Sequence, residues 1–342
     1  MLTESWDRYL VNFPDEAKDI YFAEAYVRAQ ASADDIPLCF VYNEGANYFL
    51  CTFLKRRVAW LPDDRYDVET PYGYGGPITN SRDPDFILRA AACMAEELQE
   101  ARVIAAFLRF HPLLENQELL SGRSCFEVMP DRETVVMNLS LSEEEIWGEH
   151  IHGKHRNAIS QARRAGLTFH VDRDGVYLDD FRSLYEATMN RLAADDFYFF
   201  SREYFTETMR LSPRAFLGVV LKDKRCIAAA FFLNGGIFGH YHLSASDLAA
   251  QVWRPNNFMI YEAALALKGE GARWFHLGGA ADSVNSQSLF QFKSRFSKVR
   301  KRFFIGKAVL DQESYDAACA KWLVKYPEKQ DRYGHFLLKY RF

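Results

Sequence analysis

The sequence lacks the marks of secreted, membrane-spanning or strongly basic proteins. Its six cysteines are scattered and form no Cys-x-x-Cys pair, which argues against a zinc site or a disulfide framework and favours free thiols in a reducing compartment. The longest apolar runs are far shorter than a membrane span. The opening residues MLTESWDRYLVNFPDE contain no apolar signal core. We therefore expect a cytoplasmic protein without an integral membrane segment, and we expect no bound metal.

The chain also lacks a large excess of charge of either sign. Lys and Arg number 42 against 46 Asp and Glu, a formal net charge of -4, so no nucleic-acid footprint covers the whole protein. Basic residues cluster locally at 298–302, where a groove for an anionic partner such as tRNA remains open. With 342 residues and 49% apolar composition, the chain is long enough for two domains that each bury a core.

The segment SLFQFKSRFSKVRKRFF at 288–304 combines this basic cluster with phenylalanines. Phe290, Phe292 and Phe296 alternate with polar residues that include Lys293 and Arg295. A period of two places successive side chains on opposite faces of a strand. The spacing therefore predicts a strand that buries its phenylalanines and presents Lys293 on its polar face.

Two blocks of the sequence share one order of elements: a strand meander, a helix, then a strand. In the first block we expect these at 37–43, 47–58, a helix from Asp83-Pro84, and 103–110. In the second we expect strands at 215–222, 226–233 and 237–244, a helix at 256–268, and a strand at 273–279. This order predicts an α/β protein with two related domains, residues 1–145 and 146–302. The helical run in 303–342 has no third core to join and is a candidate to return to the first domain.

Five segments resemble, in chain order, elements of the Fem-type aminoacyltransferases. They are PYGYGGP (71–77), LRFHP (108–112), HGKHRNAISQARRAGLTFHV (152–171), WFHLGG (274–279) and SLFQFKSRFS (288–297). The resemblance implies two tandem GNAT-like domains, each a mixed central sheet flanked by helices. It also implies an enzyme that transfers an amino acid from aminoacyl-tRNA to an amine of a peptidoglycan precursor in the cell envelope.

Such a transfer needs a positive group where negative charge develops on the attacked carbonyl, and a group that accepts the amine's proton. Lys293 matches the family lysine associated with the transferred acyl group, so the resemblance implies a catalytic role for it. A solvated lysine on a strand is the alternative. Phe292 matches the aromatic neighbour and is a substrate-binding candidate. In GHYHLSAS, either Tyr241 or His242 occupies the place of a family tyrosine. We take His242 as the second catalytic candidate and Tyr241 as substrate-binding.

Further substrate-binding candidates follow from the same resemblance. Arg28 and Arg191 correspond to anion-binding positions, and an arginine fork suits a diphosphate. Tyr74, in the glycine-rich 71–77 loop, is a candidate cleft residue. His111 stands where the family often carries a carboxylate, and a histidine there could take a proton near neutral pH.

The sequence determines the acyl donor of this reaction least well. GNAT domains that bind coenzyme A carry a Q/R-x-x-G-x-G/A loop before a helix. Here the corresponding segment is QVWRPNN (251–257), which lacks those glycines. Asn256 and Asn257 can cap the helix and are the cofactor-binding candidates. We therefore favour aminoacyl-tRNA over acyl-CoA as donor and expect no other cofactor. Two alternatives remain: an acyl-CoA-dependent N-acetyltransferase of a sugar amine or amino acid, and an inactive ligand-binding relative.

Overall fold

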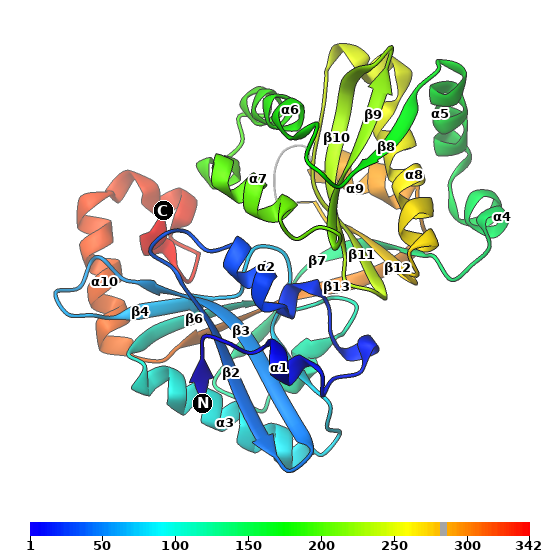
Figure 1. The fold of residues 1–342 in the computed structure, drawn as a ribbon. Helices are drawn as coiled ribbons and strands as arrows, with labels where there is room; N and C mark the ends of the chain where they lie inside the picture. Colours follow the sequence, from blue (N-terminus) through cyan, green and yellow to red (C-terminus); the bar gives the residue numbers. More distant parts are fainter. Residues whose placement is uncertain (281–285) are drawn as a thin grey trace. The chain divides into compact units, whose positions relative to one another are not determined.

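The computed structural model describes residues 1–280 and 286–342, and the chain folds into two compact units. Unit 1 comprises Met1–Asp131 together with Arg302–Phe342, and unit 2 comprises Arg132–Lys301 (Figure 1). The boundary between the two units, after Asp131, lies closer to the N-terminus than the predicted domain end at residue 145. Residues 303–342 fold with unit 1. Within the described residues, every helix is too short or too polar to traverse a lipid bilayer.

Unit 1 is built around a mixed sheet with the strand order β1-β2-β3-β4-β6-β13, and β5 pairs with β3. Its strands are β1 (Leu2–Thr3), β2 (Ile36–Glu44), β3 (Asn47–Arg57), β4 (Tyr66–Glu69), β5 (Pro77–Thr79), β6 (Val103–Arg109) and β13 (Val299–Val309). The predicted hairpin is confirmed: β2 and β3 pair antiparallel around a turn in which Gly45 has a φ of 59°. The parallel pairing of β4 with β6 requires a crossover, which contains a helix.

That crossover helix is α3 (Pro84–Glu100), and it begins where the sequence predicts. The Asp83 side chain accepts the N–H of Asp85 at 3.0 Å, and Pro84 occupies the first helical position, where its missing N–H costs nothing. The apolar residues of one stripe, from Phe86 to Leu98, are buried in the core of unit 1. The helices α1 (Asp7–Leu10), α2 (Glu24–Ala29), α10 (Gln312–Lys325) and α11 (Gln330–Tyr333) complete the unit.

The sheet strands of unit 2 follow the order β7-β12-β11-β10-β9-β8. Its strands are β7 (Glu127–Asn138), β8 (Thr168–Asp172), β9 (Ala215–Lys222), β10 (Arg225–Asn234), β11 (Phe238–Ser246) and β12 (Trp274–Gly278). The strands β9 to β12 confirm the four strands predicted in the second block. Among the described strand pairs of unit 2, β11 and β12 run parallel and the others antiparallel, and α8 (Pro255–Gly269) connects β11 to β12.

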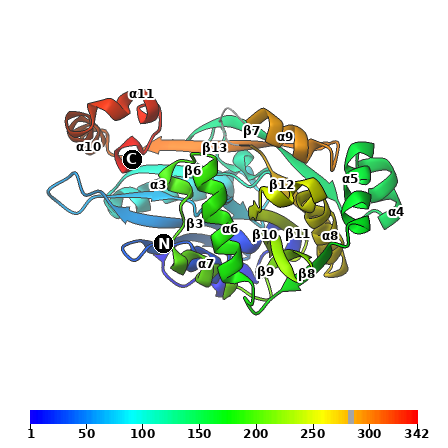
Figure 2. The same cartoon turned by 90° about the horizontal axis from the view of Figure 1, so that it is seen from above.

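Helices cover both faces of the unit 2 sheet, as Figures 1 and 2 show. On one face, α6 (Leu178–Arg191) packs against β10 and β11, and α7 (Arg202–Met209) packs against β9. On the other, α8 packs against β9, β10 and β11, and α5 (Gly153–Arg164) packs on α8. Successive side chains of a strand point to opposite faces of the sheet. Neighbouring residues of β11 therefore face different helices.

The segment predicted as a strand from residue 288 is a helix, so that prediction was wrong. Residues Ser286–Ser294 form α9, and β13 begins only at Val299. Phe292 lies in α9 and Phe296 in the turn that follows it, and both pack into the core of unit 2. The alternation of apolar and polar residues over this short stretch fits a strand as well as a helix, so the pattern alone predicted the wrong element.

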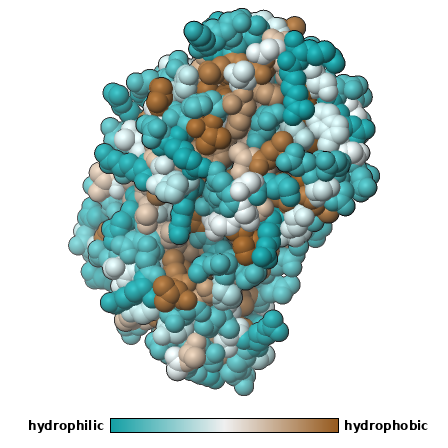
Figure 3. All heavy atoms as spheres, turned by 45° about the vertical axis from the view of Figure 1, so that its right-hand side comes forward, coloured by the Kyte–Doolittle hydropathy of each residue, from teal (hydrophilic) through white to brown (hydrophobic). Residues whose placement is uncertain are grey.

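Most of the surface is polar, and apolar side chains reach it in separate patches. Figure 3 shows one face of the chain, on which brown apolar groups lie among hydrophilic atoms. In unit 2, Phe197 and Phe199 follow α6 and are 44% and 42% exposed. Single exposed apolar residues of this kind are common on protein surfaces.

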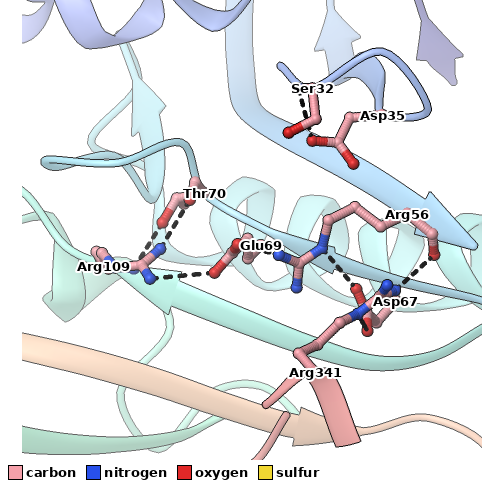
Figure 4. A network of polar contacts seen from close by, with 8 residues as sticks. All are labelled: Ser32, Asp35, Arg56, Asp67, Glu69, Thr70, Arg109 and Arg341. Atoms are coloured by element: carbon pink, nitrogen blue, oxygen red, sulfur yellow. Dashed lines mark hydrogen bonds and ion pairs between the residues drawn. The ribbon is translucent and has the colours of Figure 1, made fainter. Parts of the chain in front are cut away.

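A network of charges inside unit 1 ties the C-terminal segment to its sheet (Figure 4). The fully buried carboxylate of Asp67 lies between two arginines, 3.0 Å from Arg56 Nε and 2.8 Å from Arg341 Nε. Glu69 pairs with Arg56 and, at 3.1 Å, with Arg109. Each carboxylate therefore has two cationic partners, which offsets the cost of burying its charge.

Candidate acyl-transfer site

Lys293 lies on α9 and is only 8% exposed, so it is not a solvated surface lysine. Its Nζ donates a hydrogen bond of 2.6 Å to the carbonyl oxygen of Gly279, just beyond the end of β12. A lysine ammonium has three donors, so this bond leaves two for other acceptors. The side chain therefore brings a cation to the end of a parallel strand.

The two glycines at this point are required by the backbone. Gly278 has a φ of 73°, a conformation that a residue with a Cβ rarely adopts. A Cβ on Gly279 would lie 2.8 Å from the carbonyl oxygen of Glu133 on β7. Arg132, also on β7, lies close to the same segment, and its Nη1 donates to the carbonyl of Ala280 at 3.0 Å. The WFHLGG segment thus positions the carbonyl that holds Lys293.

The surroundings of Lys293 make it easier to deprotonate. Burial, and then the nearby positive charge of Arg132, lower the pKa of Lys293 from 10.5 to about 8. Its Nζ also lies 5.8 Å from the ring centroid of Tyr241, and burial raises the pKa of the Tyr241 phenol to about 12. At neutral pH the lysine remains mostly charged, and near pH 8 both of its forms are populated.

His155 lies in the 152–171 segment but was not predicted as a site residue, and it fixes α9 in place. Its ring packs against Phe292 and Phe296, with centroids 5.0 and 4.5 Å apart, and its Nε2 lies 2.8 Å from the carbonyl oxygen of Phe292. Burial lowers the pKa of His155 to about 4, so the ring is neutral and Nε2–H donates. His155 thereby positions the helix that carries Lys293.

His242 lies on the opposite face of the sheet from Lys293. Its Nε2 is 2.7 Å from the hydroxyl of Tyr204 on α7, whereas Tyr241 packs into the cluster beneath α8. Burial, and then the charge of His240, lower the pKa of His242 to about 3. The imidazole stays neutral at physiological pH and is a weak proton acceptor. The structure thus brings Lys293, Tyr241 and Phe292 together and places His242 elsewhere.

The start of α8 differs from the predicted asparagine cap. Arg254, in a left-handed conformation with a φ of 60°, is the N-cap residue, and no described side chain makes a capping hydrogen bond there. Pro255 is the first helical residue because its fixed φ suits that position. Asn256 instead donates from Nδ2 to the Ser246 hydroxyl at 3.1 Å, and Asn257 is buried. The expectation that an asparagine caps this helix was wrong.

His111 and Tyr74 lie together in unit 1. The Nδ1 atom of the fully buried His111 accepts the N–H groups of Leu113 and Leu114, both at 3.2 Å. Its Nε2 lies 2.7 Å from Asp19 Oδ2 and therefore donates to that carboxylate. The Tyr74 ring, half-buried, packs 6.0 Å from the imidazole. His111 thus organises the loop that follows β6.

The two predicted anion-binding arginines are exposed. Arg28, on α2, pairs with Glu24 one turn earlier at 2.9 Å and is 47% exposed at its side chain. Arg191 lies in the last turn of α6, where a cation is favourable beside the negative end of the helix dipole. Each guanidinium is accessible within its own unit.

Known proteins resemble this chain in the sequence of unit 2 and in the fold of the whole chain. Residues 152–294, from the N-cap of α5 to the end of α9, match the family model described as Acetyltransferase (GNAT) domain. Among solved structures, FemX aligns with a TM-score of 0.70 at 14% identity, over 92% of this chain and 99% of that chain. The C-terminal domain of a putative lysylphosphatidylglycerol synthetase from Agrobacterium fabrum aligns with a TM-score of 0.55 at 18% identity, over 92% and 93%.

A tandem GNAT protein from the clavulanic acid biosynthesis pathway aligns with a TM-score of 0.50 at 10% identity, over 90% of this chain and 98% of that chain. A search of curated proteins finds no significant match. Residues 152–294 of unit 2 therefore carry a GNAT domain, the domain of an acyltransferase. The whole chain has the tandem GNAT-like fold of FemX, so the Fem-type resemblance read from the sequence is confirmed for the fold.

Proposed function

We propose that the protein is a Fem-like N-acyltransferase, which transfers an aminoacyl or acyl group to an amine of a cell-envelope precursor of the peptidoglycan type. The observation that carries the proposal is the buried Lys293, which α9 and Gly279 hold at the end of β12 inside the GNAT domain. A protein does not bury a lysine and depress its pKa without a compensating gain, so perturbed lysines concentrate at functional sites.

The reaction is the attack of a neutral amine on the carbonyl carbon of an ester or thioester. A C–N bond forms, the C–O or C–S bond to the donor breaks, and the amine's proton passes to the leaving group. Lys293 can stabilise the negative charge on the carbonyl oxygen when protonated. When neutral, it can accept the amine's proton. A pKa of about 8 makes both forms available, and the pH dependence of the rate separates the two roles.

Aminoacyl-tRNA is the donor that we favour, because the segment before α8 lacks the glycines that cradle a pyrophosphate. Arg254 and Pro255 occupy that turn instead. The basic residues Lys298, Arg300 and Lys301 follow Lys293 closely in the sequence and suit an anionic donor. The likeness to a lysylphosphatidylglycerol synthetase also supports an aminoacyl donor.

An acyl-CoA-dependent N-acetyltransferase of a sugar amine or amino acid is the second candidate. Its support is the match of residues 152–294 to the GNAT domain and the likeness to the tandem GNAT protein from the clavulanic acid biosynthesis pathway. Titration calorimetry separates the donors. Binding of coenzyme A weaker than about millimolar supports the first candidate, and micromolar binding supports the second.

Product formation tests the proposal directly. Purified full-length protein is incubated with charged tRNA or acetyl-CoA, each with nucleotide-linked muropeptides, glucosamine or free amino acids, and products are identified by mass spectrometry. We expect a new amide on the muropeptide with charged tRNA, formed about 10²–10³ more slowly by Lys293→Met. Muropeptide binding without any product would instead indicate an inactive ligand-binding relative.

A further inference from the structure

The C-terminal part of unit 1 is basic, although the chain as a whole is acidic. Residues 321–342 contain six Lys and Arg residues against two Asp and Glu residues, which gives this segment a net charge of +4. The whole chain has a formal net charge of -4. A local reversal of the sign of charge marks a surface that attracts an anionic partner.

Three lysines of this segment lie around two half-buried aromatic rings. The Nζ atom of Lys325 lies 5.5 Å from the ring centroid of Trp60 and 5.2 Å from that of Tyr326, and the two rings are 6.0 Å apart. Lys329 Nζ lies 4.4 Å from the Tyr326 centroid. Lys321 Nζ donates to the carbonyl oxygen of Trp60 at 3.0 Å. The contacts therefore gather three ammonium groups over one short stretch of surface.

Two aliphatic side chains protrude beside these lysines. Val324 is 85% exposed and Leu323 41% exposed, both in the last turn of α10 at the periphery of unit 1 (Figure 1). Their neighbour Trp322 is fully buried in a core cluster of unit 1. The exposed lysines Lys321 and Lys325 stand one helical turn apart, before and after the aliphatic pair. We call the aliphatic pair, the three lysines and the two rings the Trp60 patch.

The combination of charge and aliphatic groups favours a lipid surface over other anionic partners. A nucleic acid would attract the lysines, but aliphatic side chains give its bases no ring on which to stack. A second copy meeting the first through the same patch would bring like charges together. An anionic bilayer suits both features, because its headgroups attract ammonium groups and its acyl boundary takes up apolar side chains. Trp and Tyr are also enriched at that depth of a membrane.

We propose that the Trp60 patch binds the surface of an anionic lipid bilayer. Leu323 and Val324 enter the boundary between headgroups and acyl chains, while the three lysines contact the lipid phosphates. Each lysine near such a surface strengthens binding about fivefold, so the attachment is peripheral and reversible. The inference goes beyond the proposed function and does not depend on acyl transfer.

Co-sedimentation of the purified full-length protein with large unilamellar vesicles tests the proposal, without acyl donor or acceptor. One set of vesicles consists of phosphatidylcholine, and the other contains about 30% phosphatidylglycerol, so the two sets differ in surface charge. We expect partitioning onto the anionic vesicles to be at least about tenfold stronger. It should weaken when NaCl is raised from about 0.1 M to about 0.5 M, because salt screens exposed charges.

Variants separate the two contributions of the patch. Replacing Lys321 and Lys325 together with glutamine should weaken binding to the anionic vesicles about tenfold to thirtyfold. Val324→Ser should weaken it about threefold to tenfold, because it removes apolar contact and leaves every charge in place. Since Val324 is 85% exposed, its replacement leaves the core of unit 1 intact.

Matched controls come from unit 2. Replacing Lys154 and Lys224 together with glutamine removes two exposed lysines outside the patch, and Val176→Ser alters a valine that is 72% exposed. Both controls should bind vesicles like the wild type. Far-ultraviolet circular dichroism shows that each variant is folded.

Equal binding to both kinds of vesicle would overturn the proposal, as would no binding to either, or losses in the control variants as large as those in the patch variants. Loss of tRNA binding in the double lysine variant, with vesicle binding unchanged, would make the partner a nucleic acid instead. Dimerisation that Val324→Ser abolishes, again without an effect on vesicles, would make it a second copy. Vesicle binding without any acylated product would refute only the proposed function, whereas acyl transfer without vesicle binding would refute only the lipid surface.

Discussion

Replacing Lys293 with methionine should stabilise the protein while it slows acyl transfer by about 10²–10³. The lysine is 8% exposed, and burial lowers its pKa from 10.5 to about 8. That difference corresponds to about 3 kcal/mol by which the folded state disfavours the charged form. Methionine has a similar shape and no charge, but it leaves the Gly279 carbonyl without its donor, which costs about 1–2 kcal/mol. The difference between these two contributions predicts that the free energy of unfolding of Lys293→Met exceeds that of the wild type by about 1–2 kcal/mol at pH 7.

The pH dependence of stability gives a second, independent measure of the same charge. The folded-state pKa of Lys293 lies below the unfolded value, so the unfolded chain binds more protons between pH 8 and pH 10.5. The wild type should therefore become more stable, relative to Lys293→Met, as pH rises through this window. If the ammonium stabilises the oxyanion, the rate should fall over the start of the same window, and a rate that rises there would indicate a base.

Urea unfolding followed by far-ultraviolet circular dichroism and tryptophan fluorescence measures the stability, and single-turnover transfer measures the chemical step. Loss of one oxyanion donor typically costs about 10²–10³ in rate. Lys293→Arg keeps the charge and serves as a control for it. A variant Lys293→Met that is destabilised by more than about 2 kcal/mol, or that retains full turnover, would refute the reasoning and make the lysine a structural tie between α9 and β12.

Three further expectations follow from other parts of the chain. Replacing Arg300 and Lys301 with alanine should weaken binding of charged tRNA and reduce the slope of log K against log salt by about 1.4–1.8, measured by filter binding. Asp67→Ala should destabilise unit 1 by about 3 kcal/mol in urea unfolding, since it leaves two arginines without their buried partner, whereas Asp64→Ala, in an exposed pair, should cost less than about 1 kcal/mol. Because the pKa of His155 is about 4 in the folded state, the stability that its burial gives at neutral pH should be lost as pH falls from 6.5 to 4, and His155→Leu should remove that loss. An unchanged pH profile in that variant would contradict the assigned protonation.

Sequence alone determined the elements whose signals are local. The helix α3 was predicted at its first residue because Asp83 and Pro84 form a cap and the apolar stripe behind them has one period. The hairpin β2–β3 and the strands β9 to β12 were predicted because each is a buried run between turn residues. The repetition of one element order indicated two related α/β domains, and short motifs in the right order indicated the Fem-type fold.

Tertiary structure decided what depends on distant partners. The segment around Lys293 carries both a period of two and a spacing of four, and its helical form is fixed by His155, 137 residues earlier in the chain. The same packing buries the lysine against Gly279 and lowers its pKa, which no neighbouring residue in the sequence could reveal. Likewise, His242 and Tyr241 are adjacent in sequence, yet the pleat of β11 sends them to opposite faces of the sheet. The sequence therefore supplied the elements and the candidate side chains. The long-range packing determined which of them meet, because burial and pairing arise only when remote segments come together.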